Sequence, residues 1–336
     1  MRALVLHGPG SYSVEPNWPR PEVRAGWALI RVHYAGVCGS DLPRFAVTGS
    51  YRHPMILGHE FSGTVETPAP GSGLFKAGEE VAVLPIIPCG VCDGCRSGEP
   101  FHCRNYQFIG SRNDGGYAEF CLVPEQNLLQ IPPEFGLRAG AFIEPIAVAL
   151  HVVRRSGFVH GKSALVYGAG AIGLLIGLWL RVFGASRIVI AVVRSDSLGR
   201  ARDLGFEEVF DPSQGEAPGT FDALFEAAGS SRALVSAVQS AADKGTLTVV
   251  GRDVQDTVLP RGTFEKLMRK ELTVHGCWGY NLAGEEEFLV RTLRQRSIRV
   301  EPMVSHEVTL EKAPETIRAM CDRTFPYCKV LLRIAG

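Results

Sequence analysis

The sequence predicts a two-domain α/β protein, in which a doubly wound parallel sheet is inserted late into a β-rich domain. A chain of 336 residues is long enough for about two domains, each with its own core. The first 150 residues are rich in glycine, proline and β-branched residues, whereas strand-like and helix-like stretches alternate from about residue 160. After Trp278 the alternation ends. We therefore expect one domain over residues 1–150 and 280–336, and a second over 151–279.

Short apolar runs separated by turn residues characterise the first 150 residues. Ala28–Val32 and Glu80–Val83 are two of these runs. This pattern is typical of irregular, mostly antiparallel β structure. Near the C-terminus we expect a helix over Glu285–Arg296 and a strand over Lys329–Ile334, which return the chain to this first domain.

The middle of the chain contains short apolar runs without polar alternation, as expected of buried parallel strands. These runs are Ala164–Tyr167, Ile188–Val193, Ala223–Glu226, Thr246–Val250 and Leu272–His275. Helix-like stretches separate them. One is Ser231–Ala241, where Ser230 or Ser231 can cap the helix and apolar residues recur at helical spacing.

Composition excludes several classes of partner. Lys plus Arg equals Asp plus Glu at 35 each, and no basic stripe is visible, which disfavours nucleic acid and anionic membranes as partners. The start of the chain lacks the long apolar stretch of a secretory signal, and the longest apolar run, Ala171–Leu180, is about half the length of a membrane span. We expect a cytoplasmic protein whose partner is a small molecule.

A glycine-rich turn follows the first strand of the middle domain, in the segment Gly168-Ala-Gly-Ala-Ile-Gly173. In a strand–turn–helix of this kind, glycines permit a tight turn, close approach of a pyrophosphate and close helix packing, and the helix N-terminus attracts the phosphates. The spacing alone is weak evidence, but the strand before it and the helix after it agree. We assign cofactor binding to Gly168, Gly170, Ala171, Ile172, Gly173, Ala228 and Gly251.

The end of the second strand lacks the carboxylate that usually holds the ribose 2′-hydroxyl of NAD. Val192 occupies the matching position, and Arg194 follows it. An arginine there can pair with a 2′-phosphate, so this pattern favours NADP over NAD and adds Arg194 to the cofactor set. In the alternative interpretation, Arg194 faces solvent and Asp196 reaches the ribose, which leaves NAD as the cofactor.

Four of the nine cysteines cluster as Cys89-x2-Cys92-x2-Cys95-x7-Cys103. Four thiolates at short spacing satisfy a tetrahedral zinc ion. Iron–sulfur proteins share the opening of this pattern, but there the fourth cysteine follows sooner and precedes proline. Here Arg104 follows the fourth cysteine, which favours zinc. Because thiolates fill every position, we expect this zinc to be structural.

A second set of metal-ligating residues is dispersed through the first domain: Cys38, His59, Glu60 and Glu144. Together they offer a thiolate, an imidazole and carboxylates, a mixed set that leaves zinc with an open or exchangeable position. Ser40 can hydrogen-bond an alcohol at that position. Asp41 can orient the distal nitrogen of His59.

These residues also carry a resemblance to a known family. CGSDLPR (38–44), GHEFSG (58–63), the cysteine cluster, GSRNDGGYAEF (110–120), FIEPIAVALH (142–151) and GAGAIG (168–173) resemble the zinc-containing medium-chain dehydrogenases, and especially their polyol branch. The likeness runs from about residue 25 to the C-terminus. It implies a GroES-like catalytic domain, a Rossmann domain, two zinc ions per chain and a homo-oligomer, dimer or tetramer. It also implies that Cys38, His59 and Glu144 ligate the catalytic zinc, with Glu60 as an alternating ligand.

Two departures from the family pattern qualify the resemblance. Val192 replaces the usual acidic ribose ligand, and Pro43 stands where many alcohol dehydrogenases have a proton-relay histidine. Any relay must then start at Ser40. The resulting hypothesis is zinc-assisted interconversion of a secondary alcohol, such as a polyol, cyclitol or sugar phosphate, and its ketone.

Two rival functions are an NAD-linked dehydrogenase of an amino-alcohol or simple alcohol, and an inactive structural relative. The joint presence of Cys38, Ser40, His59 and Glu144 argues against the second.

Overall fold

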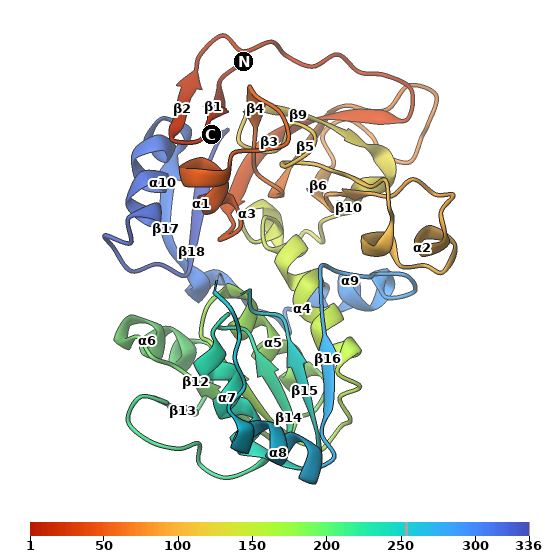
Figure 1. Cartoon of the computed structure of the whole chain (residues 1–336). Coiled ribbons are helices and arrows are strands. Elements are labelled where there is room, and N and C mark those ends of the chain that lie inside the picture. The colour runs from red at the N-terminus through yellow and green to blue at the C-terminus, as the bar shows by residue number, and fades with distance from the viewer. Residues whose placement is uncertain (253–254, 336) are drawn as a thin grey trace. The chain divides into compact units, whose positions relative to one another are not determined.

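The computed structural model describes residues 1–252 and 255–335, and the chain separates into two compact units (Figure 1). The first unit comprises Met1–Glu144, Ala283–Arg296 and Val304–Gly336. The second comprises Pro145–Leu282 and Ser297–Met303. No helix of the described residues is both long and apolar enough to cross a bilayer.

The first unit is built mainly of antiparallel strands. Its largest sheet has the order β10-β6-β5-β3-β18-β17, with β9 also paired to β3, and only β17 and β18 run parallel. The strands of this sheet are β3 (Trp27–Val37), β5 (Glu60–Thr67), β6 (Glu80–Val83), β9 (Phe120–Pro124), β10 (Leu128–Gln130), β17 (Val304–Thr309) and β18 (Lys329–Arg333).

Smaller elements complete the first unit. A three-stranded sheet contains β1 (Ala3–Gly8), β2 (Ser11–Glu15) and β4 (Met55–Ile56), and a two-stranded one contains β7 (Ile86–Ile87) and β8 (Gln107–Phe108). The helices are α1 (Asp41–Pro43), which continues as a π-helical turn at Arg44–Thr48, α2 (Asp93–Arg96), α3 (Gly136–Gly140), α9 (Glu286–Arg294) and α10 (Ala313–Cys321). Helix α4 (Ile143–Arg155) begins in this unit and continues in the second.

Strand β3 is the centre of the first unit, because it pairs with β5, β9 and β18. Its apolar residues Ala28, Ile30 and Val32 are fully buried, as a strand flanked by partners requires. The register places Gly36 of β3 opposite Glu60 of β5, and Leu331 of β18 opposite Gly36. Three segments far apart in sequence therefore meet at the C-terminal end of β3.

The second unit is a parallel six-stranded sheet in the order β13-β12-β11-β14-β15-β16 (Figure 1). The strands are β11 (Ser163–Tyr167), β12 (Arg187–Ala191), β13 (Glu208–Phe210), β14 (Phe221–Glu226), β15 (Ala241–Val249) and β16 (Thr273–Gly276). The helices are α5 (Ala171–Val182), α6 (Ser195–Asp203), α7 (Ser231–Ser240) and α8 (Arg261–Arg269). Strand order reverses at β11, which makes the end of β11 the switch point of a doubly wound sheet.

The predicted fold class is confirmed, with a difference at one strand. All five apolar runs form parallel strands, and Ser230 caps α7 by accepting a hydrogen bond from the Ala233 amide. Strand β13 was not predicted. Its three residues are only half-buried or exposed, so they lack the apolar run that identified the others.

Candidate functional site

Three of the predicted metal ligands meet at the end of β3. Cys38 follows β3, whereas His59 and Glu60 lie at the start of β5. The Cys38 sulfur, one imidazole nitrogen of His59 and one carboxylate oxygen of Glu60 all lie within 4.8 Å of one another. His59 and Glu60 are buried, and Cys38 is half-buried. A thiolate, an imidazole and a carboxylate at this separation are the ligand types that zinc takes in catalytic sites.

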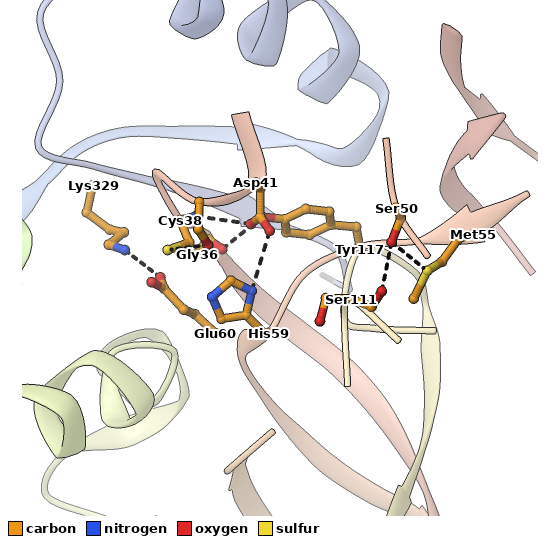
Figure 2. A network of polar contacts seen from close by, with 11 residues as sticks. Gly36, Cys38, Asp41, Ser50, Met55, His59, Glu60, Ser111, Tyr117 and Lys329 are labelled. Atoms are coloured by element: carbon orange, nitrogen blue, oxygen red, sulfur yellow. Dashed lines mark hydrogen bonds and ion pairs between the residues drawn. The ribbon is translucent and has the colours of Figure 1, made fainter. Parts of the chain in front are cut away.

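Asp41 lies behind His59, as predicted from the sequence (Figure 2). Its carboxylate Oδ1 is 3.4 Å from His59 Nδ1, and its Oδ2 accepts hydrogen bonds from the Tyr117 hydroxyl at 2.6 Å and the Cys38 amide at 3.3 Å. Asp41 is fully buried, so these contacts fix its position. A carboxylate on Nδ1 leaves Nε2 of the imidazole for a metal ion.

The electrostatic field at His59 favours positive charge. Burial lowers the pKa of His59, but the negative charges of Asp41 and of the Cys38 thiolate outweigh burial and hold that pKa well above its ordinary value. The same anionic neighbours stabilise a cation at this point. The donor set therefore fits a divalent metal ion.

Glu60 forms an ion pair with a buried lysine that sequence reasoning missed. Lys329, the first residue of β18, donates from Nζ to Glu60 Oε2 at 2.5 Å, and both side chains are at most 5% exposed (Figure 2). Burial lowers the pKa of Lys329, but the charges of Glu60 and Cys38 raise it above its ordinary value. A Cβ on Gly36 would lie 2.5 Å from Glu60 Oε2, so glycine makes room for this pair.

Glu144 lies outside the group of three donors that approach one another within 4.8 Å. It sits in the first turn of α4 and is buried. Burial raises the pKa of Glu144 to about 7, and the charges of Glu60 and Asp41 act in the same direction against those of His59 and Lys329. Its role as a zinc ligand stays a prediction.

Ser40 lies beside the ligand cysteine. Its hydroxyl donates a hydrogen bond to Cys38 Sγ at 3.2 Å, and the residue is exposed. A hydroxyl that is both next to a predicted metal ligand and open to solvent is placed to exchange protons with water.

The four clustered cysteines converge on one point within a short loop that contains α2. Their sulfur atoms all lie within 4.8 Å of one another, with separations of 3.5 Å between Cys92 and Cys95 and 3.9 Å between Cys89 and Cys95. A tetrahedral zinc–thiolate site has sulfur atoms roughly 3.8 Å apart. Hydrogen bonds from the Cys95 and Arg104 amides lower the pKa of Cys92 to about 6, whereas burial and the neighbouring Cys92 raise the pKa of Cys95 to about 11, so the convergence of the four sulfur atoms carries the assignment. The arrangement therefore fits a zinc ion bound by four thiolates.

The glycine-rich turn connects β11 to α5, in the second unit. Gly168 has φ +111°, and a Cβ there would lie 2.8 Å from the Ala228 amide nitrogen. A Cβ on Gly173 would lie 1.8 Å from the Gly168 carbonyl oxygen. Around Gly170, in contrast, a Cβ would meet nothing within 4 Å, and no side chain caps α5. Open space in front of uncapped helix amides fits a pyrophosphate group.

Ala228 and Gly251 follow β14 and β15, where Glu226 organises both turns. Glu226 Oε1 accepts hydrogen bonds from the Ala228 and Gly229 amides at 3.0 and 2.8 Å, and its carbonyl accepts one from Gly251. Gly251 is required because a Cβ there would lie 2.2 Å from the Gly229 nitrogen. Glu226 was predicted only as a strand residue, since a carboxylate that ends a buried strand has no spacing signature.

Arg194 and Asp196, on which the choice between NADP and NAD was predicted to depend, form an ion pair with each other. Arg194 donates from Nε and Nη2 to the carboxylate of Asp196, at 3.0 and 3.2 Å. Arg200 lies 3.7 Å from the same carboxylate, and Val192 is buried. An exposed ion pair contributes little stability, so either Arg194 or Asp196 can exchange it for a contact with a ligand.

Comparison with known proteins gives two matching families. The model of the alcohol dehydrogenase GroES-like domain matches residues 24–133, and that of the zinc-binding dehydrogenase matches residues 171–294. Galactitol 1-phosphate 5-dehydrogenase of Escherichia coli K12 is 35% identical over 90% of this chain and 91% of the relative. Human sorbitol dehydrogenase is 29% identical over 93% and 90%.

Solved structures agree with these matches. The crystal structure of galactitol-1-phosphate dehydrogenase from Escherichia coli has a TM-score of 0.92 at 33% identity, and covers 99% of this chain and 100% of its own. A putative zinc-binding dehydrogenase from Sinorhizobium meliloti 1021 bound to NADP has a TM-score of 0.90 at 28% identity, over 99% and 98%. The resemblance stated from the sequence motifs is therefore confirmed.

Proposed function

The chain belongs to the zinc-binding alcohol dehydrogenase family, a family of oxidoreductases that act on CH–OH donors, and we propose that it interconverts a secondary hydroxyl of a polyol or polyol phosphate and the corresponding ketone. The observation that carries this proposal is the convergence of ligand atoms from Cys38, His59 and Glu60 within 4.8 Å of one another, with Asp41 behind His59. Polyols are the proposed class because the two relatives above are named for galactitol 1-phosphate and sorbitol.

Two zinc ions per chain are part of the proposal. Cys38, His59 and Glu144 would hold the catalytic ion with Glu60 as an alternating ligand, and Cys89, Cys92, Cys95 and Cys103 would hold the structural ion. When bound, the catalytic zinc would supply Lewis acidity toward a hydroxyl group, and the nicotinamide cofactor would supply the hydride acceptor. Elemental analysis should find about two zinc ions, and a chelator should remove the carboxylate-containing site first. A single chelator-resistant zinc in a fully active enzyme would contradict this assignment.

The chain's own residues position and move protons. Asp41 holds the imidazole of His59 through Nδ1, and Tyr117 holds Asp41. Lys329 neutralises Glu60, so that the carboxylate beside Cys38 and His59 does not add an unbalanced charge. Ser40 Oγ accepts the substrate's hydroxyl proton and passes it to water, because Pro43 offers no relay group.

The cofactor would lie against the glycine-rich turn, with its pyrophosphate at Gly170 and the start of α5. We propose NADP as the preferred cofactor and NAD as the alternative. The Arg194–Asp196 pair must open for Arg194 to meet a 2′-phosphate, and Arg200 can then retain Asp196. Arg194→Ala should reduce the NADP preference in kcat/KM, and Val192→Asp should reverse it. Higher efficiency with NAD in the unmodified enzyme would overturn this choice.

We also propose a cytoplasmic homo-oligomer, a dimer or tetramer. Its support is the sheet edge at β16, where Val274 is 46% exposed and the nearby Trp278 is 62% exposed. An exposed apolar edge strand is a template for pairing with another copy. Light scattering of the purified protein tests this, and a monomer at micromolar concentration would contradict it.

One panel of initial rates tests the proposed function directly. It pairs polyols and polyol phosphates with NAD and NADP, and includes simple alcohols and amino-alcohols. We expect oxidation of at least one polyol class, lost in His59→Ala. Turnover confined to simple alcohols or amino-alcohols would favour the rival dehydrogenase activity.

A further inference from the structure

Lys329 places a positive charge inside the protein, beside residues that we propose as ligands of a positive ion. Its Nζ donates to Glu60 Oε2 at 2.5 Å, and the two side chains are 5% and 3% exposed (Figure 2). Across residues 1–252 and 255–335, no other cationic side chain lies within ion-pair distance of Glu60. Removing two charges from water costs about as much as their attraction returns, so stability alone does not account for this pair.

The fold fixes Lys329 in this position. Ser305 Oγ donates to the Lys329 carbonyl at 3.0 Å and accepts from the Cys328 amide at 3.1 Å, which anchors the backbone at the start of β18. A Cβ on Gly36 would lie 2.5 Å from Glu60 Oε2 and 3.4 Å from Lys329 Cδ, so the absence of a side chain there leaves room for both partners. The pair is therefore set by the sheet and not by a mobile surface contact.

The same Glu60 carboxylate is within reach of the proposed metal ligands. One of its oxygens lies within 4.8 Å of the Cys38 sulfur and of an imidazole nitrogen of His59. In the proposed site Glu144 would supply a second carboxylate, so the protein offers one ligand more than a tetrahedral ion needs when a substrate hydroxyl also binds. An ammonium group on Glu60 reduces the negative charge that this carboxylate offers to a metal ion. Glu60 is then the weaker of the two carboxylates.

We propose that Lys329 competes with the catalytic metal ion for the Glu60 carboxylate, and so makes Glu60 the ligand that a substrate hydroxyl displaces. This inference rests on the proposed function, in which Glu60 is an alternating ligand, and it assigns control of that alternation to Lys329. Lys329 is a positioning residue, because it acts through Glu60. If Lys329 only supported the site, its loss would weaken metal binding, whereas competition requires that its loss strengthens metal binding.

The first test measures the zinc affinity of the labile site in Lys329→Met, by competition with a chromophoric chelator. Methionine keeps an apolar stem in the buried position and removes the ammonium group, so Glu60 is free to bind the ion. Zinc affinity should rise about 10–100-fold, the usual effect of one charged hydrogen bond. Lys329→Gln keeps a hydrogen-bond donor without the charge, should give a smaller rise, and carries the test if Lys329→Met does not fold. Unchanged or lower zinc affinity in the folded variants would overturn the proposal.

A double variant tests whether the effect passes through Glu60. In a Glu60→Gln background, Lys329→Met should not raise zinc affinity, because the carboxylate for which the lysine competes is gone. Arg333→Met is the matched control, since Arg333 lies on the same strand, is exposed and is outside ion-pair distance of Glu60. It should leave zinc affinity unchanged. An equal rise in Arg333→Met or in the double variant would assign the effect to net charge and overturn the proposal.

Steady-state rates connect the competition to substrate binding. In zinc-loaded Lys329→Met the KM for a polyol should rise about 10-fold or more, because Glu60 no longer yields its position, and kcat should change less. An unchanged KM together with raised zinc affinity would show that Glu60 and the substrate do not exchange, and would overturn the proposal. The zinc measurements require no turnover. If they respond as expected while the unmodified chain oxidises no polyol, only the proposed function is contradicted.

Discussion

The two candidate metal-binding clusters of the first unit are built in opposite ways: the loop cluster is Cys89, Cys92, Cys95 and Cys103, and the mixed cluster is Cys38, His59 and Glu60. Cys89, Cys92, Cys95 and Cys103 come from one loop, carry identical ligands and receive hydrogen bonds from neighbouring backbone amides. Cys38, His59 and Glu60 come from the ends of two strands, differ in chemistry and are backed by buried charged side chains. The first arrangement needs only a local loop conformation, whereas the second needs the whole sheet.

This difference supports the different tasks proposed for the two clusters. Four thiolates satisfy a zinc ion completely, so the loop cluster can contribute only stability. A mixed cluster with Asp41 and Lys329 behind it controls charge and ligand orientation, which are the requirements of a reacting site. The comparison predicts that substitutions in one cluster affect folding and substitutions in the other affect turnover.

The largest effect is expected at the mixed cluster. His59→Ala and Cys38→Ala should reduce turnover to background, because each removes a proposed ligand of the catalytic ion. Cofactor affinity should be nearly unchanged, since the glycine-rich turn belongs to the other compact unit. Steady-state rates and fluorescence titration with the dinucleotide measure the two quantities. A His59→Ala enzyme with substantial turnover would show that the mixed cluster is not the reacting site.

In the loop cluster, Cys92→Ser should lower the stability of the protein and leave the catalytic rate of the folded enzyme largely unchanged. We expect the free energy of unfolding to fall by more than about 3 kcal/mol, since loss of a metal site is among the largest effects of one substitution. Folded enzyme that remains at low temperature should retain most of its kcat. Denaturant titration and rates per folded molecule test this. If the variant folds normally and loses turnover alone, the structural assignment fails.

A smaller loss of rate is expected at Ser40, which touches the mixed cluster without being a ligand. Ser40→Ala should lower kcat by about 10²–10⁴-fold, the usual range for a proton-transfer group, while the zinc content stays at about two. Ser40→Thr keeps the hydroxyl and should restore part of the rate. Unchanged turnover in Ser40→Ala would mean that the proton leaves by another route.

The sequence was sufficient for the loop cluster because its ligands are close in the chain, and spacing alone identifies such a site. It was also sufficient for most of the parallel sheet, since buried strands have an apolar pattern. Strand β13 escaped because its three residues show none. These are local signals, and they are read without knowing the fold.

The mixed cluster was only partly predictable from the chain. Asp41 was found because it lies three residues from Cys38, but Lys329 was missed because only the pairing of β18 with β3 and of β3 with β5 brings it to Glu60. Tyr117 lies in a motif that indicated the family, yet no pattern relates its hydroxyl to Asp41. Contacts that depend on register between distant strands require the structure.

The smallest effect is expected at the charged residues behind the mixed cluster, and it tests whether they contribute to the zinc affinity of that cluster. Asp41→Asn keeps the size of the side chain but replaces the charge that holds His59 Nδ1, so the affinity of the mixed cluster for zinc should fall about 10–100-fold. Asp41 is fully buried, so its substitution can disturb folding, and Tyr117→Phe serves as a milder second variant. It removes the hydrogen bonds that the Tyr117 hydroxyl donates to Asp41 Oδ2 and to the Gly36 carbonyl, and leaves the Asp41 carboxylate in place. Asp93→Asn, which changes an exposed carboxylate beside the loop cluster, is the matched control and should change the zinc affinity of neither cluster.

Competition with a chromophoric chelator resolves the two zinc ions by their lability. Equal zinc retention in Asp41→Asn, Tyr117→Phe and Asp93→Asn would mean that the ligands alone hold the catalytic ion. The two clusters would then differ only in the type of their ligands, and not in the residues behind them.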